Sequence, residues 1–195
     1  MGNVLPFVAR PMRESDIPTV MSIERLSFPT PWPEAAYYYE LRFGANARFL
    51  VLQRQQEEPA QLPWYDRLRG RQPDPPALIG YVGVRLRDAA AHISTIAVHP
   101  DWRGQGVGKL ILLISLEEAS RHGAQRVTLE VRASNTVAQK LYAQVGFTQI
   151  GVRPAYYQDG EDGLTMLLEP LNEACLARLC NLRQMVEERL LKTIE

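Results

Sequence analysis

The stretch VHPDWRGQGVGKL, residues 98–110, decides the fold of this chain, because it joins a strand-like run to a helix-like run. Gly104, Gly106 and Gly108 stand at alternate positions within it. Glycine adopts backbone angles that other residues avoid and lets a ligand approach the main chain closely. The first amides of a helix have no partner within the helix, so a glycine-rich turn there suits a phosphate group. An ordinary flexible loop is the alternative for these letters alone.

Two common phosphate-binding motifs do not fit this stretch. A P-loop requires Ser or Thr directly after its lysine, whereas Leu110 follows Lys109 here. A dinucleotide-binding turn requires glycines in the pattern G-x-G-x-x-G, and the third glycine is misplaced in 104–108. The expected phosphate ligand is therefore neither of the two commonest kinds.

The charge balance of the chain excludes any general attraction to a polyanion. The 195 residues contain 22 Lys and Arg against 22 Asp and Glu, so we expect no direct nucleic-acid or membrane partner. A hydrophobic content of 46% fits one compact domain with a sizeable core. The N-terminus lacks the pattern of a secretory signal and the longest apolar run, 110–114, is short, so we expect a cytoplasmic protein.

Hydrophobic periodicity predicts alternating helices and strands along the chain. Helices are expected over residues 17–26, from Pro33, over 109–123, over 136–145 and from Leu171, and strands over 47–53, 77–86, 91–100, 125–134 and twice within 147–170. The Pro-rich segment 53–76 predicts a long inserted surface loop, whose Trp64 and Tyr65 either bind a partner or pin the loop to the body. We expect one domain over 1–170, with an amphipathic helix over 171–195 packed on it or at an interface.

Several ordered motifs resemble one family. The turn RGQGVG, 103–108, is similar to the pyrophosphate turn of the GNAT acyltransferase superfamily. The stretch 95–108 resembles the fourth strand and loop of that family, and LEVRASNTVAQKLYAQVGF, 129–147, its fifth strand and following helix. Together with IERLSFPTPW, 23–32, and RPAYYQDGEDGLTM, 153–166, they resemble the branch of ribosomal-protein-alanine N-acetyltransferases (RimI-type). The inserted loop and the C-terminal helix depart from that pattern.

The resemblance implies an α/β (α+β) fold whose mixed central sheet is splayed between the fourth and fifth strands, with flanking helices and acetyl-CoA in the opening. The expected coenzyme-binding residues are Ile96, Ala97 and Val98 for the pantetheine arm, and Arg103, Gly104, Gln105, Gly106, Val107, Gly108 and Lys109 for the pyrophosphate. Asn135 would bind the coenzyme or brace the turn, and capping of the next helix is compatible with both roles. No metal is required, and for His92, His99 and His122 we expect surface or strand-end positions.

The resemblance also implies the catalytic groups. Glu130 corresponds to the general base, acting directly or through water, and Tyr142 to the general acid that protonates the departing thiolate. From the letters alone, the alternative for Glu130 is a solvated strand carboxylate, and the alternative for Tyr142 is an aromatic side chain of the core. Apolar surroundings would raise the pKa of Glu130 and make it a better base. Trp32, Tyr156 and Tyr157 resemble residues that line the acceptor cleft, with core packing as the competing interpretation of each.

The function that these residues predict is acetylation of a protein N-terminus, with the N-terminal alanine of a ribosomal protein as the expected acceptor. One alternative keeps the chemistry but changes the acceptor to a lysine or a small amine. A second alternative is a coenzyme-binding module without catalysis, which the presence of both Glu130 and Tyr142 disfavours. We expect a monomer or a weak dimer.

Overall fold

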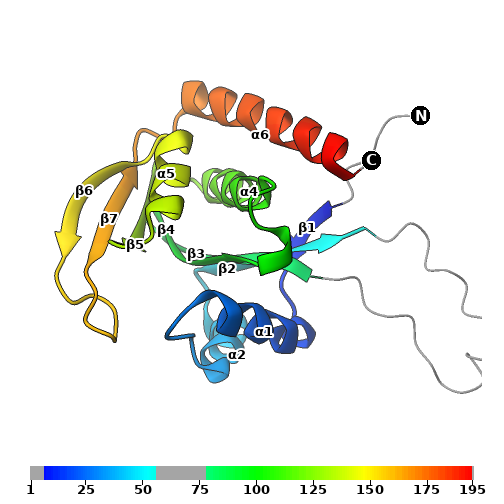
Figure 1. Ribbon diagram of the computed structural model, residues 1–195. Coiled ribbons are helices and arrows are strands. Elements are labelled where there is room, and N and C mark those ends of the chain that lie inside the picture. Colours follow the sequence, from blue (N-terminus) through cyan, green and yellow to red (C-terminus); the bar gives the residue numbers. More distant parts are fainter. Residues whose placement is uncertain (1–6, 56–77, 195) are drawn as a thin grey trace, which may run out of the picture.

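The computed structural model describes residues 7–55 and 78–194, which form a seven-stranded sheet with helices on both faces (Figure 1). The strands are β1 (Phe7–Pro11), β2 (Ala47–Arg54), β3 (Leu78–Arg87), β4 (Ala90–Val98), β5 (Arg126–Arg132), β6 (Thr148–Arg153) and β7 (Gly163–Leu168). The α-helices are α1 (Ile17–Ser27), α2 (Glu34–Phe43), α4 (Val107–Arg121), α5 (Thr136–Val145) and α6 (Glu173–Ile194), and two short 3-10 turns cover Glu14–Asp16 and Pro100–Trp102.

The strand order is β1-β2-β3-β4-β5-β7-β6, and β4 and β5 are the parallel pair within it. Parallel neighbours need a crossover connection, which α4 supplies on one face of the sheet. The other strand pairs of the described residues are antiparallel, and the turn between β3 and β4 contains Asp88 with a positive φ of 53°. The predicted hairpin around Asp88 is confirmed.

The sheet opens between β4 and β5, which confirms the predicted splay. Pairing of the two strands begins at Ala90 with Arg126 and ends at Ile93 with Leu129, although both strands continue beyond that point. At the same place the register between β3 and β4 shifts, so that Ser94 is an extra residue on β4. A bulge of this kind bends its strand and increases the local twist, which helps β4 to turn away from β5.

Helices α4, α5 and α6 cover one face of the sheet, and α1 and α2 cover the other (Figure 1). Alternation along β5 turns Val127, Leu129 and Val131 into the core beneath α4, as predicted. The intervening side chains, Glu130 among them, therefore lie on the opposite face. Helix α4 is buried over most of its surface, which explains why its apolar residues are not confined to a narrow stripe.

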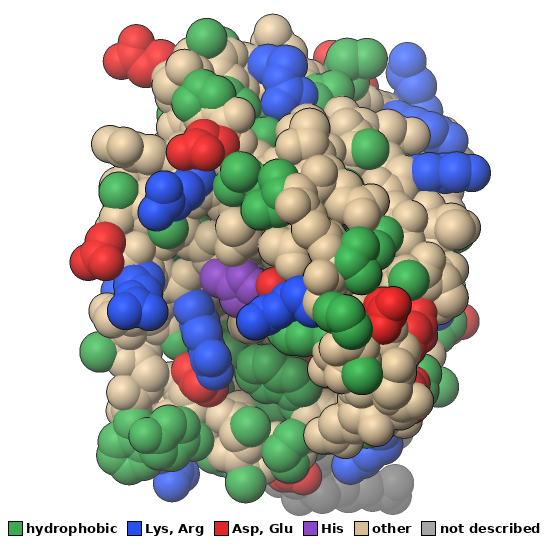
Figure 2. All heavy atoms as spheres, turned by 90° about the vertical axis from the view of Figure 1, so that its left-hand side faces the viewer, with side chains coloured by type: hydrophobic (Ala, Val, Ile, Leu, Met, Phe, Trp, Pro, Cys, Tyr) green, Lys and Arg blue, Asp and Glu red, His purple; other side chains and the backbone are tan. Residues whose placement is uncertain are grey.

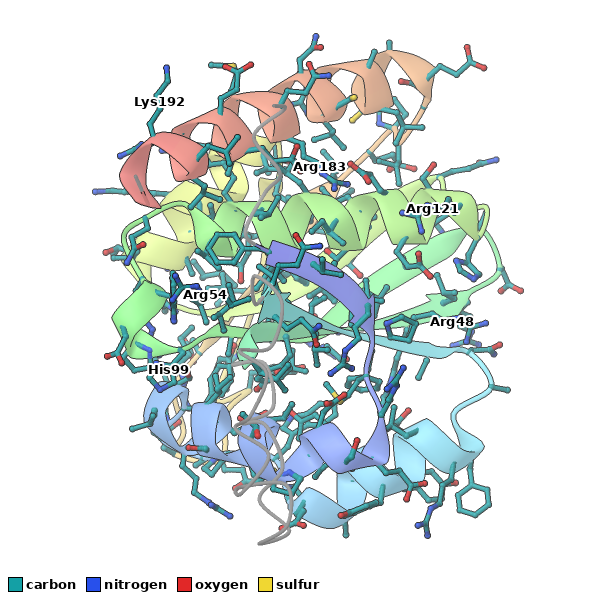
Figure 3. All side chains as sticks on the ribbon, turned by 90° about the vertical axis from the view of Figure 1, so that its right-hand side faces the viewer. Arg48, Arg54, His99, Arg121, Arg183 and Lys192 are labelled. Atoms are coloured by element: carbon teal, nitrogen blue, oxygen red, sulfur yellow. The ribbon has the colours of Figure 1, made fainter. Side chains whose placement is uncertain are left out.

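The C-terminal helix α6 packs on α4. Leu179 and Leu190 are buried there, and Arg183 Nη1 lies 2.6 Å from Glu117 Oε2. Figure 3 shows Arg183 between the two helices. Since the contact lies within one chain, α6 extends the core of the same domain. None of the helices in the described ranges is long and apolar enough to cross a membrane.

Strand β1 was not predicted, and most predicted element boundaries differ from the structure by one or two residues, of which three bear on the site. Helix α4 begins at Val107, two residues before the predicted start, and Pro33 precedes α2 as its N-cap instead of opening it. Strand β2 continues to Arg54, so the predicted loop cannot begin at Gln53. The rest of that loop falls mostly on 56–77, outside the described residues, as do its Trp64 and Tyr65.

Candidate active site

The N-terminus of α4 presents main-chain amides without partners among the described residues. Gly106 is the N-cap with a φ of 104°, and Gly104 has a φ of 75°, so the turn uses left-handed backbone at two of its three glycines. No side chain caps the helix, and the first helical hydrogen bond runs from the Leu110 amide to the Gly106 carbonyl at 3.0 Å. The amides of residues 107–109 are thus directed out of the helix end, as an anion site requires.

The charged and polar side chains of this turn bind protein atoms. Arg103 donates to the Val98 carbonyl at 3.0 Å and to Ser27 Oγ at 2.8 Å, which ties the turn to the end of α1. Lys109 donates to Gln144 Oε1 at 2.6 Å, and the side-chain amide of Gln105 donates to a carbonyl of the preceding turn. An anion would therefore be attracted mainly by the main-chain amides, and the side chains of Arg103 and Lys109 lie near them.

The free edge of β4 begins where its pairing with β5 ends. Ile96, Ala97 and Val98 pair with β3 on one side, opposite Val82, Tyr81 and Gly80, and have no strand partner on the other side among the described residues. An extended ligand carrying amide groups can pair with such an edge as a strand would. The predicted pantetheine-binding segment thus runs along one wall of the opening and leads to the turn before α4.

Glu130 lies one residue beyond the last β4–β5 pair, at the point where the strands part. Its side chain is 8% exposed, with Arg153 Nη1 3.1 Å from Oε1 and His92 Nε2 3.3 Å from Oε2. The Tyr156 hydroxyl donates to Oε2 at 3.5 Å. The surroundings of Glu130 are charged and not apolar, because the strand register brings two basic groups to it. His92 lies near the start of β4, and its side chain is 35% exposed.

Tyr142 is buried on α5 against Phe147, with ring centroids 6.0 Å apart. Its hydroxyl makes no hydrogen bond within 7–55 and 78–194. Burial, with a smaller contribution from Tyr157, raises the pKa of Tyr142 well above its usual value of 10. Burial likewise raises the pKa of Tyr157 to about 12. Tyr156 packs edge-on against Tyr157 at 5.1 Å, so this tyrosine pair adjoins Glu130.

Arg132 connects the two loops that flank this group. Its Nη1 lies 2.6 Å from Glu161 Oε2 and 2.8 Å from Asp159 Oδ2, and its guanidinium stacks 4.1 Å from the Tyr157 ring. It also donates to Thr30 Oγ1, in the loop between α1 and α2, at 3.5 Å. Hydrogen bonds from the side chain and the amide of Ser134, together with Arg132, lower the pKa of Glu161 to about 2. Asp162 Oδ1 accepts a hydrogen bond from the Ala155 amide at 2.8 Å, so all three acidic residues of the β6–β7 loop hold that loop in place.

Two predicted site residues have clear structural roles in addition to any contact with a ligand. Asn135 Oδ1 accepts a hydrogen bond from the Ala138 amide at 3.1 Å, so Asn135 caps α5. Trp32 packs against Tyr37 at 5.8 Å, and the guanidinium of Arg85 lies 5.9 Å from its ring. Trp32 thus belongs to the cluster beneath α1 and α2, and no ring contact within 7–55 and 78–194 joins it to Tyr156 or Tyr157.

One buried polar group was not identified from the sequence. Glu24 on α1 is fully buried and accepts a hydrogen bond from the Tyr37 hydroxyl, which also contacts the Tyr81 hydroxyl at 3.3 Å. The second oxygen, Oε2, is the one buried side-chain N or O atom of the described residues without a hydrogen-bond partner. Burial raises the pKa of Glu24. Its position on the apolar face of a helix, four residues after Val20, is the signal that could have indicated it.

Figure 2 views the molecule from the side on which β6 and β7 lie in Figure 1. Basic side chains gather around the middle of this face, where the surface is hollowed and hydrophobic side chains lie inside the hollow. Acidic side chains lie beside several of these basic ones on the same face (Figure 2).

Comparison with known proteins gives one consistent result. The family model "Acetyltransferase (GNAT) family" matches residues 17–147, more than half of the chain. A Bacillus subtilis protein named provisionally as a [ribosomal protein bS18]-alanine N-acetyltransferase is 35% identical over 158 residues, which cover 80% of this chain and 91% of that protein. The [ribosomal protein bS18]-alanine N-acetyltransferase of Salmonella typhimurium is 31% identical over 157 residues, covering 79% and 91%. The crystal structure of the ribosomal-protein-S18-alanine N-acetyltransferase from Escherichia coli superposes with a TM-score of 0.67 at 25% identity, covering 85% of this chain and 94% of that one.

Proposed function

Because this chain belongs to the acetyltransferase (GNAT) family, we propose that it transfers an acetyl group from acetyl-CoA to the α-amino group of a protein N-terminus. The proposed acceptor is the N-terminal alanine of a ribosomal protein of the bS18 type, in line with the names of the relatives in Bacillus, Salmonella and Escherichia. The observation that carries the proposal is the opening between β4 and β5, with Glu130 at its inner end and uncapped amides of α4 at its outer end.

The proposed coenzyme site uses main-chain groups. The free edge at Ile96, Ala97 and Val98 would pair with the amides of the pantetheine arm, and the amides of 104–109 would receive the diphosphate. Arg103 and Lys109 would add positive charge beside the diphosphate, whether or not they keep their contacts with Ser27 and Gln144. Acetyl-CoA supplies the activated acetyl group, and the chain supplies its orientation.

The proposed chemistry is direct transfer between two bound substrates. The neutral amine attacks the thioester carbonyl, a C–N bond forms and the C–S bond breaks. Glu130 takes the proton that the amine loses, and Tyr142 donates a proton to the departing thiolate. The Tyr142 hydroxyl is protonated at neutral pH, as a general acid must be, although burial raises its pKa and so makes it a weaker acid. The tyrosine pair 156–157 would contact the first residues of the acceptor beside Glu130.

The proposal is tested by measuring thiol release from acetyl-CoA with three acceptors: a peptide with the N-terminal sequence of bS18, the same peptide acetylated at its N-terminus but carrying a free lysine, and a polyamine. We expect turnover with the first alone. Turnover only with the second or third would show a lysine or small-amine acetyltransferase, and coenzyme binding without turnover would show a module without catalysis.

The assigned roles are tested by Glu130→Gln and Tyr142→Phe. Each is expected to lower kcat by about 100-fold, the scale on which a positioned acid or base contributes, while coenzyme affinity stays within about threefold of wild type. Isothermal calorimetry with acetyl-CoA separates the two effects. Wild-type turnover in both variants would remove the assignments.

A further inference from the structure

His92 is placed in a row of polar side chains that crosses three strands. In the sheet register it stands opposite Arg85 on β3 and Thr128 on β5. Its Nδ1 lies 3.1 Å from Thr128 Oγ1, and its Nε2 lies 3.3 Å from Glu130 Oε2. The imidazole therefore lies between the hydroxyl of Thr128, its partner on β5, and the carboxylate of Glu130, which accepts the amine proton in the proposed function.

The chemistry of the two neighbours determines where the imidazole carries its hydrogen. An ionised carboxylate only accepts hydrogen bonds, so the contact with Glu130 is favourable when Nε2 is protonated. In the neutral ring Nδ1 is then the acceptor, and the Thr128 hydroxyl can donate to it. The alternative acceptor for that hydroxyl, the Ala91 carbonyl, is 3.5 Å away, which is a longer contact than the 3.1 Å to His92. The chain Thr128–His92–Glu130 is therefore oriented in one direction.

We propose that His92 is a positioning residue for Glu130: its neutral imidazole holds the carboxylate at the end of the β4–β5 opening, oriented through Thr128. The inference rests on the proposed function, in which Glu130 accepts the amine proton. Arg153 contacts the other carboxylate oxygen at 3.1 Å from an exposed position on the edge strand β6. His92 is thus the inner support of Glu130 and Arg153 the outer one.

The proposal makes activity depend on the protonation of His92. A protonated ring would add a second full positive charge beside Glu130, next to that of Arg153, and would make the carboxylate a weaker base. Burial lowers the pKa of His92 from its usual 6.5, with Arg85 and Arg153 acting in the same direction and Glu130 opposing them. Tyr156, which contacts Glu130, remains neutral because burial raises its pKa. The neutral, supporting form of His92 therefore predominates above pH 6.5 and is lost as the pH falls below it.

The first test compares two substitutions with different chemistry. His92→Gln keeps an N–H donor but cannot titrate, whereas His92→Leu removes the donor at similar volume. We expect kcat to fall by about tenfold or more in His92→Leu and by clearly less in His92→Gln, with the KM for acetyl-CoA within about twofold of wild type in both. His122→Gln, at the far end of α4 where His122 contacts Arg48, is the matched control. Equal losses in the Gln and Leu variants, or no loss in either, would overturn the proposal.

The second test is the ratio of kcat/KM in His92→Gln to that in wild type, measured from pH 8 to pH 5. Titration of the acceptor amine is common to both proteins and cancels in the ratio. We expect the ratio to be constant above pH 7 and to rise by about threefold or more towards pH 5, because the wild type alone gains the charge at position 92. A ratio that does not change with pH would contradict the proposal.

The third test does not depend on turnover. The pKa of His92 is read from the pH dependence of its imidazole resonances by NMR in wild type and in Glu130→Gln. Loss of the carboxylate is expected to lower the pKa of His92 further. An unchanged pKa of His92 would overturn the coupling between the two residues. Failure of the bS18-type peptide as an acceptor would instead overturn the proposed function.

Discussion

Replacing Gly108 with alanine is expected to weaken coenzyme binding without destabilising the fold, whereas the same change at Gly106 is expected to destabilise the fold. The two glycines are neighbours in the same turn, yet the structure gives them different constraints. Gly106 has a φ of 104°, whereas Gly108 lies inside the first turn of α4 with ordinary helical geometry.

The contacts around each position set the magnitudes. A Cβ at Gly108 would lie 3.6 Å from Leu141 Cδ2 and 3.8 Å from Val98 Cγ2, which are ordinary contact distances. Alanine also has the higher helix propensity, so Gly108→Ala should leave the free energy of unfolding unchanged or raise it by up to about 1 kcal/mol. A Cβ at Gly106 would lie 3.6 Å from Val186 Cγ1 without a clash, so its cost is the left-handed backbone alone, about 1–2 kcal/mol.

The effect on coenzyme binding follows from what the new methyl group covers. At Gly108 it would stand beside the amides that the proposed diphosphate approaches. The loss of one hydrogen bond to a charged group costs about 1.5–3 kcal/mol, which corresponds to a Kd about 10- to 100-fold higher.

Isothermal calorimetry with acetyl-CoA and thermal unfolding measure the two effects separately. Gly106→Ala should lower the Tm by about 2–8 °C, and Gly108→Ala should not lower it. Gly151→Ala, on the edge strand β6 with nothing within 4 Å of the new Cβ, is the control for both measurements. A Gly108→Ala protein that binds acetyl-CoA as wild type does would show that the diphosphate is bound elsewhere. A Gly106→Ala protein as stable as wild type would refute the constraint on the turn.

Three further predictions concern the buried acid, the loop anchor and the C-terminal helix. Because burial raises the pKa of Glu24, the wild type loses stability as the pH rises through that pKa. The Tm of Glu24→Gln relative to that of wild type should therefore increase between pH 4 and pH 8. A difference in Tm that does not change with pH would contradict this prediction. Arg132→Ala should raise the KM for the acceptor peptide several-fold in steady-state assays and leave the KM for acetyl-CoA unchanged. The reason is that Arg132 holds the loop that carries Tyr157, and this loop is not part of the proposed diphosphate site. Parallel changes in both constants would count against this prediction. Leu190→Ala should lower the free energy of unfolding in urea by about 2–5 kcal/mol, whereas Met185→Ala, at a side chain 66% exposed, should change it by less than about 0.5 kcal/mol; similar values would show that α6 is not docked on α4.

The comparison of sequence with structure shows which kinds of information are local. The turn before α4 could be predicted because glycine reports on its own backbone: two of the three glycines do have a positive φ. The alternation along β5 could be predicted because a strand with one buried face requires it. The capping role of Asn135 and the stop of α5 at Gly146 are equally local, since each depends on residues within one helical turn.

Contacts between distant segments could not be predicted in this way. The sequence marks His92 as one polar residue in an alternating strand, and its contact with Glu130 depends on which strands are neighbours and in what register. The charged surroundings of Glu130 have the same origin, because Arg153 comes from β6 beyond β7. Trp32 could be expected at the acceptor cleft from the motif around it, yet its ring contacts are with Tyr37 and Arg85.

The amino-acid sequence by itself determined most of the elements and the glycine turn, because backbone preference and hydrophobic periodicity act over a few residues, and its resemblance to the family indicated the candidate acid and base. Tertiary structure alone decided that the sheet parts just before Glu130, that His92 supports this carboxylate and that Glu24 is buried with an unpartnered oxygen. The physical reason is that burial and charge–charge contact are set by strand order and register, which no single segment of the chain encodes.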